Sequence, residues 1–132
     1  MNAARVLIID DNHATLDLAA FALNAAAFAV ESAVDAAGAL LQVRLFKPDL
    51  ILMDIQMPGM DGLELTRRLK ADASTRHIVV VAFTAFAMSG DEAKMRAAGC
   101  DGYIAKPFDV ASFAQTVRSF IRIRGDPALH ET

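Results

Sequence analysis

Acidic and basic side chains stand at the ends of several apolar runs of this chain. Asp10 and Asp11 directly follow the run RVLII, Asp54 follows the apolar run at 49–53, and Lys106 follows a shorter run at 102–105. Three carboxylates held close together repel one another, and their pKa values rise unless a cation lies between them. Because all of these ligands are oxygens, they favour a hard ion such as Mg²⁺, which binds few carboxylates and keeps several waters.

A hydroxyl group completes this set, because Thr84 follows the apolar run at 78–83. Mg²⁺, Lys106 and Thr84 could each neutralise or hydrogen-bond one oxygen of a phosphoryl group in transfer. Such a transfer depends mostly on positioning and charge stabilisation, and a carboxylate nucleophile can take the group as an aspartyl phosphate. The residues therefore favour phosphoryl transfer to a carboxylate, provided that the fold brings them together.

The apolar runs that precede these residues indicate buried strands. Arg5–Ile9 and the runs at 49–53 and 78–83 are too uniformly apolar for strands with one exposed face. They are typical of a parallel sheet that is covered on both faces. Weaker strand candidates are Ala29–Ala33 and Gly102–Ala105, which we expect nearer the edges of the sheet.

Helical periodicity fills the intervals between the strands. Apolar stripes begin at Leu16 and Val110, and the segment 61–71 has Asp61 as its expected N-cap. The stripes are Leu16, Ala19, Ala20, Leu23 and Ala27; Ala36, Ala39, Leu40 and Val43; and Val110, Phe113, Val117, Phe120 and Ile121, with a further helix over 89–98 that Gly99 closes. Five strands alternating with five helices predict an α/β, doubly wound, parallel sheet, in which ligands bind beyond the carboxyl ends of the strands.

Composition sets the limits of these predictions. The chain has 132 residues, 55% of them hydrophobic and 22% charged, which suits one domain with a packed core. We expect this domain over residues 1–124, followed by a loose tail over 125–132. A net charge of −3 argues against a nucleic-acid partner, and no membrane span or export leader is apparent. One cysteine, Cys100, fits a buried position and a reducing cytoplasm.

Four motifs in this order resemble the response regulator receiver family, with its CheY-like, flavodoxin-like fold. They are VLIIDDN at 6–12, DIQMPGMDG at 54–62, TA at 84–85 and KP at 106–107. The resemblance covers about residues 5–123 and implies the sheet order 2-1-3-4-5. Within the family, the stretches at 51–56, 84–88 and 99–100 look most like DivK-type single-domain regulators.

The resemblance also implies roles for individual residues. Asp54 would be phosphorylated, and Asp11, Asp54 and the carbonyl of Gln56 would ligate Mg²⁺, with Asp10 acting mainly through water. Lys106 would pair with the phosphoryl group, and Thr84 and Tyr103 would form the switch. A cis peptide before Pro107 would aim Lys106 inward.

The resemblance extends to partners. A sensor histidine kinase or a histidine phosphotransfer protein would donate the group, and a downstream protein would bind the face of the fourth helix, fifth strand and fifth helix. The chain would catalyse only its own phosphorylation and dephosphorylation.

Other readings remain open at this point. Asp10 and Asp11 could be a helix N-cap pair, Thr84 could cap the next helix, and Tyr103 could be a static interface aromatic. The chain could also be the receiver of a hybrid histidine kinase or a binding module that works without phosphorylation. A metal-dependent phosphatase is a rival, but an enzyme of this kind would separate its two acids by one residue, whereas Asp10 and Asp11 are adjacent. A flavin-binding flavodoxin is another, but it would need an uncharged phosphate loop after the first strand.

Overall fold

The computed structural model describes residues 3–57, 59–85 and 89–125. Most of the expected tail, 126–132, lies outside these residues. So do residue 58 of the motif at 54–62 and residues 86–88 of the stretch at 84–88. The last helix extends to Gly125, so the boundary that we place after residue 124 remains a prediction.

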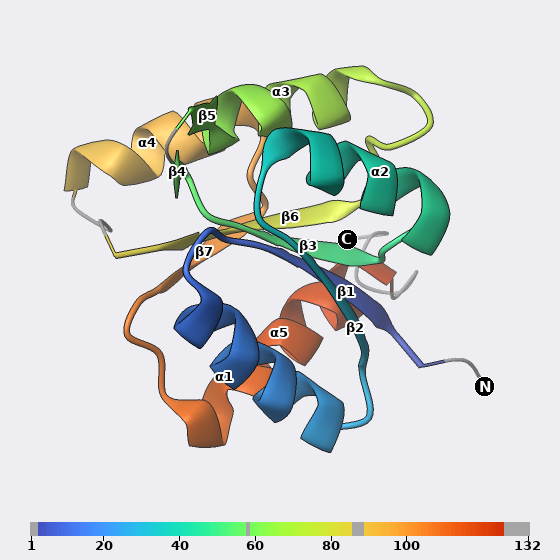
Figure 1. Ribbon diagram of the computed structural model, residues 1–132. Helices are drawn as coiled ribbons and strands as arrows, with labels where there is room; N and C mark the ends of the chain where they lie inside the picture. Colours follow the sequence, from blue (N-terminus) through green and yellow to red (C-terminus); the bar gives the residue numbers. More distant parts are fainter. Residues whose placement is uncertain (1–2, 58, 86–88, 126–132) are drawn as a thin grey trace.

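Five parallel strands form the central sheet (Figure 1). They are β1 (Arg5–Ile9), β2 (Ala29–Ala33), β3 (Leu50–Met53), β6 (Val79–Thr84) and β7 (Gly102–Ala105). Their order in the sheet is β2-β1-β3-β6-β7. This is the order 2-1-3-4-5 of the five expected strands, and both the doubly wound α/β class and the strand order are confirmed. A separate antiparallel pair, β4 (Gln56–Met57) and β5 (Met60–Asp61), follows β3 and was not predicted.

Helices cover both faces of this sheet (Figure 1). They are α1 (His13–Ala25), α2 (Ala36–Phe46), α3 (Gly62–Ala71), α4 (Ser89–Ala98) and α5 (Val110–Gly125). α1 and α5 lie on one face, and α2, α3 and α4 lie on the other. Asp61 caps α3 as expected, its Oδ1 accepting the Leu63 N–H at 2.9 Å. The cap of α1 is Asn12 rather than Asp10 or Asp11, so those two carboxylates are left for another role.

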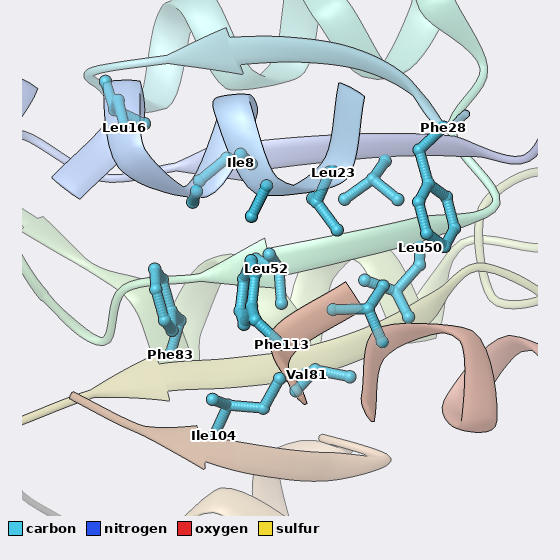
Figure 2. Close-up of a cluster of buried hydrophobic side chains, with 14 of the residues drawn as sticks. Ile8, Leu16, Leu23, Phe28, Leu50, Leu52, Val81, Phe83, Ile104 and Phe113 are labelled. Atoms are coloured by element: carbon cyan, nitrogen blue, oxygen red, sulfur yellow. The ribbon is translucent and has the colours of Figure 1, made fainter. Parts of the chain in front are cut away.

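The strands supply side chains to two separate apolar layers. Along β1, Val6 and Ile8 enter the layer beneath α1 and α5, while Leu7 and Ile9 enter the layer beneath α2, α3 and α4. Figure 2 shows the first layer, in which Ile8 lies near Leu23 and Leu52. All four of these β1 side chains are fully buried. This explains why the run lacks the alternation of a half-exposed strand.

A partly exposed ion pair holds the start of β7 against β6. Lys70 Nζ lies 2.9 Å from Asp101 Oδ2 and also donates to the carbonyl of Ile78 at 2.7 Å. The same Asp101 oxygen accepts the Val80 N–H at 2.8 Å. Since Lys70 belongs to α3 and Asp101 directly precedes β7, the pair connects three elements and sets the register of the strand that carries Lys106.

Three helical stripes each contain one residue that was predicted incorrectly. Ala27 lies beyond the end of α1 with a φ of 70°, Leu40 is 39% exposed on α2, and Val110 is 40% exposed at the start of α5. At the end of α1, the N–H groups of Ala27 and Phe28 donate to the carbonyls of Asn24 and Leu23. This is a Schellman cap, in which the left-handed position is usually glycine.

In the part of the chain that the structure describes, no helix has the length and apolar character that crossing a bilayer requires.

Candidate functional site

Three carboxylates gather at the carboxyl ends of two neighbouring strands. Asp10 follows β1 and Asp54 follows β3, and the last residues of those strands, Ile9 and Met53, are register partners. Asp11 adds a third carboxylate, which is exposed, whereas Asp10 is fully buried and Asp54 is 5% exposed. Each residue offers an oxygen within 4.8 Å of the other two. The sheet therefore brings together the acids that the sequence singles out.

Lys106 reaches the same point from the end of β7. Its Nζ lies 2.8 Å from Asp10 Oδ2 and 3.7 Å from Asp54 Oδ2. The Lys106 side chain is 17% exposed, and its backbone N–H donates to the carbonyl of Thr84 at 2.8 Å. The peptide bond between Lys106 and Pro107 is cis, as the resemblance implies. One ammonium thus faces two carboxylates that are almost completely shielded from water.

Thr84 and Tyr103 occupy neighbouring strands near this site. Thr84 ends β6, is 1% exposed, and is the register partner of Ala105. Tyr103 is the partner of Ala82 and is 39% exposed. It lines a cavity of about 340 Å³ together with Met95 of α4 and Phe120 of α5. The buried hydroxyl and the half-exposed ring are therefore two rungs apart along adjacent strands.

The segment after Asp54 returns to pack against the Asp54 backbone at Gly62. The backbone N–H of Gln56 donates to Asp54 Oδ1 at 2.9 Å, which places the backbone of Gln56 beside the carboxylate. At Gly62, a Cβ atom would lie 2.5 Å from the Asp54 carbonyl oxygen and 2.7 Å from the Cα of Ile55. Only a residue without a side chain fits there. That Gln56 ligates a metal through its carbonyl remains a prediction.

The surroundings of Asp54 raise its pKa from 3.8 to about 6. Burial is the largest cause, and the Gln56 N–H opposes it by stabilising the charged form. The neighbouring charge of Asp10 raises the pKa further, and Lys106 lowers it. Since one ammonium does not fully compensate the acids, a divalent cation among three carboxylate oxygens would relieve the remaining repulsion. The donor set suits Mg²⁺, a hard ion that oxygen ligands bind.

This shifted pKa makes a prediction for Asp54→Asn. Between pH 3.8 and about 6 the unfolded carboxyl has released its proton while the folded one keeps it. Folding therefore becomes less favourable as pH rises through that window, and the cost persists above it. Because asparagine has no charge, the variant's free energy of unfolding without metal should exceed that of the wild type by about 1–3 kcal/mol at neutral pH.

Denaturant unfolding in the presence of EDTA measures this difference. At about pH 4 both residues are largely uncharged in the folded state, so the gain should shrink towards zero. An equal gain at acidic and neutral pH would mean that the charge of Asp54 is not its cause.

Sequence reasoning missed an aromatic cluster next to Lys106. Phe83 directly precedes Thr84, and its ring centroid lies 5.1 Å from Lys106 Nζ. Phe108 and Phe113 pack against it, with centroids 5.5 and 5.8 Å away. The sequence contained a signal, because Phe83 and Phe108 each lie next to a motif residue, Thr84 and Pro107. Within an apolar strand, however, the sequence does not distinguish a residue that acts at the site from one that only packs in the core.

Comparison with known proteins places this geometry in one family. Residues 6–118 match the family described as response regulator receiver domain. The chain is 43% identical over 116 residues to the polar-differentiation response regulator DivK of Brucella anthropi, covering 88% of this chain and 94% of that protein. The protein of the same name from Brucella ovis matches with the same identity and coverage.

Solved structures agree with the fold. A receiver domain protein from Methanospirillum hungatei superposes with a TM-score of 0.85 at 26% identity, over 94% of this chain and 98% of that one. The signal receiver domain of a histidine kinase from Syntrophus aciditrophicus gives 0.82 at 28% identity, over 95% of this chain and 93% of that one. The chemotaxis protein CheY4 of Vibrio cholerae, at 24% identity and a TM-score of 0.84 over 89% of this chain and 98% of that one, supports the fold alone.

Proposed function

This chain belongs to the response regulator receiver family, and we propose that it accepts a phosphoryl group on Asp54 in a Mg²⁺-dependent reaction. Membership makes it a DivK- and CheY-like response regulator, which is consistent with two-component phosphorelay signalling. Receiver domains are generally Mg²⁺-dependent, and this chain has the acidic cluster that such dependence requires. The observation that carries the proposal is this cluster, with Lys106 facing Asp10 and Asp54.

In the proposed reaction, an oxygen of the Asp54 carboxylate attacks the phosphorus of a phosphohistidine. The bond from phosphorus to the donor's imidazole nitrogen breaks as the bond from phosphorus to the Asp54 oxygen forms, and the imidazole leaves with its electron pair. Lys106 stabilises negative charge on the phosphoryl oxygens, and the Thr84 hydroxyl would donate to one of them. Mg²⁺, held by Asp10, Asp11, Asp54 and the Gln56 carbonyl, would supply further positive charge. Asp54 must be ionised to attack, which its pKa of about 6 permits at neutral pH.

The donor is proposed to be a sensor histidine kinase or a histidine phosphotransfer protein, as the family implies. The output would be binding of a downstream protein to the face of α4, β7 and α5, where Tyr103 lines a cavity. Thr84 and Tyr103, on adjacent strands, would couple the site to that face through a shift between two populated states. A cytoplasmic location is part of the proposal, since the free thiol of Cys100 suits a reducing compartment.

Intact mass spectrometry after incubation with acetyl phosphate tests the central claim. With Mg²⁺ present, the wild-type chain should gain one phosphoryl group, and EDTA should prevent the gain. Hydroxylamine should remove the group, because it cleaves an acyl phosphate and leaves a phosphate ester on serine or threonine intact.

Two results would overturn the proposal. Absence of an adduct on folded, Mg²⁺-loaded protein would favour a receiver-shaped module that binds its partners without phosphorylation. An adduct that resists hydroxylamine would move the reaction from a carboxylate to a hydroxyl.

A further inference from the structure

The geometry around Lys106 points to a positioning role for Phe83: its ring face holds the lysine ammonium in reach of Asp54 by a cation–π interaction. The inference rests on the proposed function, because it concerns the lysine that would contact the phosphoryl group. None of the four motifs includes Phe83, which to the sequence alone is one more apolar residue of a buried strand.

Two kinds of contact hold the ammonium of Lys106. One is ionic, because Nζ lies 2.8 Å from Asp10 Oδ2 and 3.7 Å from Asp54 Oδ2. The other is the ring of Phe83, whose centroid lies 5.1 Å from Nζ. This distance is within the range of about 6 Å over which a ring quadrupole attracts a cation. Since the Lys106 side chain is only 17% exposed, water screens the attraction weakly.

The ring itself has little freedom to move. Phe83 is fully buried and contacts Phe108 and Phe113, whose own centroids are 4.2 Å apart. Phe113 belongs to α5, and Phe108 lies in the loop that follows Lys106 and Pro107. Figure 2 shows Phe83 and Phe113 in the apolar layer beneath α1 and α5. Close packing of this kind fixes the plane that the ammonium meets.

The ion pair with Asp10 and the contact with the Phe83 ring would respond differently to a bound divalent cation. Asp10 is one of the three carboxylates of the proposed metal site, so a divalent cation competes with Lys106 for its charge. The attraction of the Phe83 ring does not involve that carboxylate. It therefore keeps the ammonium beside Asp54 when the ion pair with Asp10 is weakened, which is the condition under which a phosphoryl group would arrive.

Graded fluorination of Phe83 separates this role from simple packing. Fluorine withdraws charge from the ring face and changes its volume little, so mono-, di- and trifluorophenylalanine at position 83 should slow Asp54 phosphorylation by acetyl phosphate stepwise. The trifluoro ring should reach roughly a fivefold loss of rate. Phe83→Leu keeps an apolar side chain without a π face and should lose at least as much. A second readout needs no metal or phosphoryl group: the side-chain proton resonances of Lys106 should lose their ring-current shift in Phe83→Leu.

Phe28 provides a matched control, because the guanidinium of Arg118 lies 4.5 Å from its ring centroid, outside the acidic site. The same fluorination at Phe28 should lower the free energy of unfolding and leave the phosphorylation rate within roughly twofold. Equal rates across the Phe83 series, with wild-type protein phosphorylated normally, would overturn the inference and leave the proposed function standing. A wild type that takes up no phosphoryl group would instead refute the proposed function.

Discussion

An Asp54→Asn variant should take up the phosphoryl group of acetyl phosphate far more slowly than the wild type at every Mg²⁺ concentration. An amide oxygen is a weak nucleophile without negative charge, and the substitution also removes one of the three carboxylates offered to the metal. Loss of a nucleophile typically costs several orders of magnitude, so we expect the rate to fall by at least about a thousandfold. Intact mass measured over time in parallel with the wild type gives this ratio directly.

Asp61→Asn is the matched control for that experiment. It removes the same unit of charge a few residues away, and an asparagine oxygen can still accept the Leu63 N–H that Asp61 accepts at the start of α3. This variant should be phosphorylated at a rate close to that of the wild type. An Asp54→Asn protein that still gains a hydroxylamine-sensitive group would show that another carboxylate, such as Asp10 or Asp11, is the acceptor. Denaturant unfolding of Asp54→Asn, which should be more stable than the wild type at neutral pH, checks that the variant is folded when its uptake is measured.

Gly62→Ala should strongly destabilise the fold, because Gly62 packs directly against the backbone that follows β3. The added Cβ would meet two backbone groups, the Asp54 carbonyl oxygen at 2.5 Å and the Ile55 Cα at 2.7 Å, so the chain itself must move. Overpacking against a rigid surround typically costs 1–3 kcal/mol, and backbone on both sides puts this case at roughly 3 kcal/mol or more. The shift also displaces Asp54, so phosphorylation should slow in whatever fraction still folds.

Chemical denaturation measures the loss of stability in Gly62→Ala, with Gly38→Ala as the control. At Gly38 an added methyl group has more room. Gly38 also lies in the first turn of a helix, but its added Cβ would meet Asp35 Oδ1, a side-chain atom, at 3.1 Å. There the gain in helix propensity, about 1 kcal/mol, should offset the small adjustment of Asp35. Similar losses in both variants would mean that the contact with the Asp54 backbone is not decisive.

The central strands were predictable because burial on both faces leaves a simple pattern. β1, β2 and β7 have the expected bounds, β3 begins one residue later than expected, and β6 is shifted by one residue at both ends. The short pair β4 and β5 escaped prediction, since two-residue strands have no periodicity to detect. Ala27 was assigned to a helical stripe because the cap that ends α1 uses alanine where glycine is the usual signal.

The candidate site was predictable as a set of residues and not as a set of contacts. Parallel strands bring Asp10, Asp54 and Lys106 to one edge, which topology alone dictates. That Lys106 pairs more closely with Asp10 than with Asp54 depends on side-chain positions. The same holds for the ring of Phe83 and for the missing Cβ of Gly62. Strand patterns determine which residues converge, and packing determines which of them touch.

The ion pair between Lys106 and Asp10 joins residues 96 positions apart in the chain. Asp10 and Asp54 both precede Lys106 in the chain, so during synthesis neither acid can contact this lysine until β7 has been made. The cluster of lysine and acids is therefore a property of the nearly complete fold, and no local segment of the chain contains it.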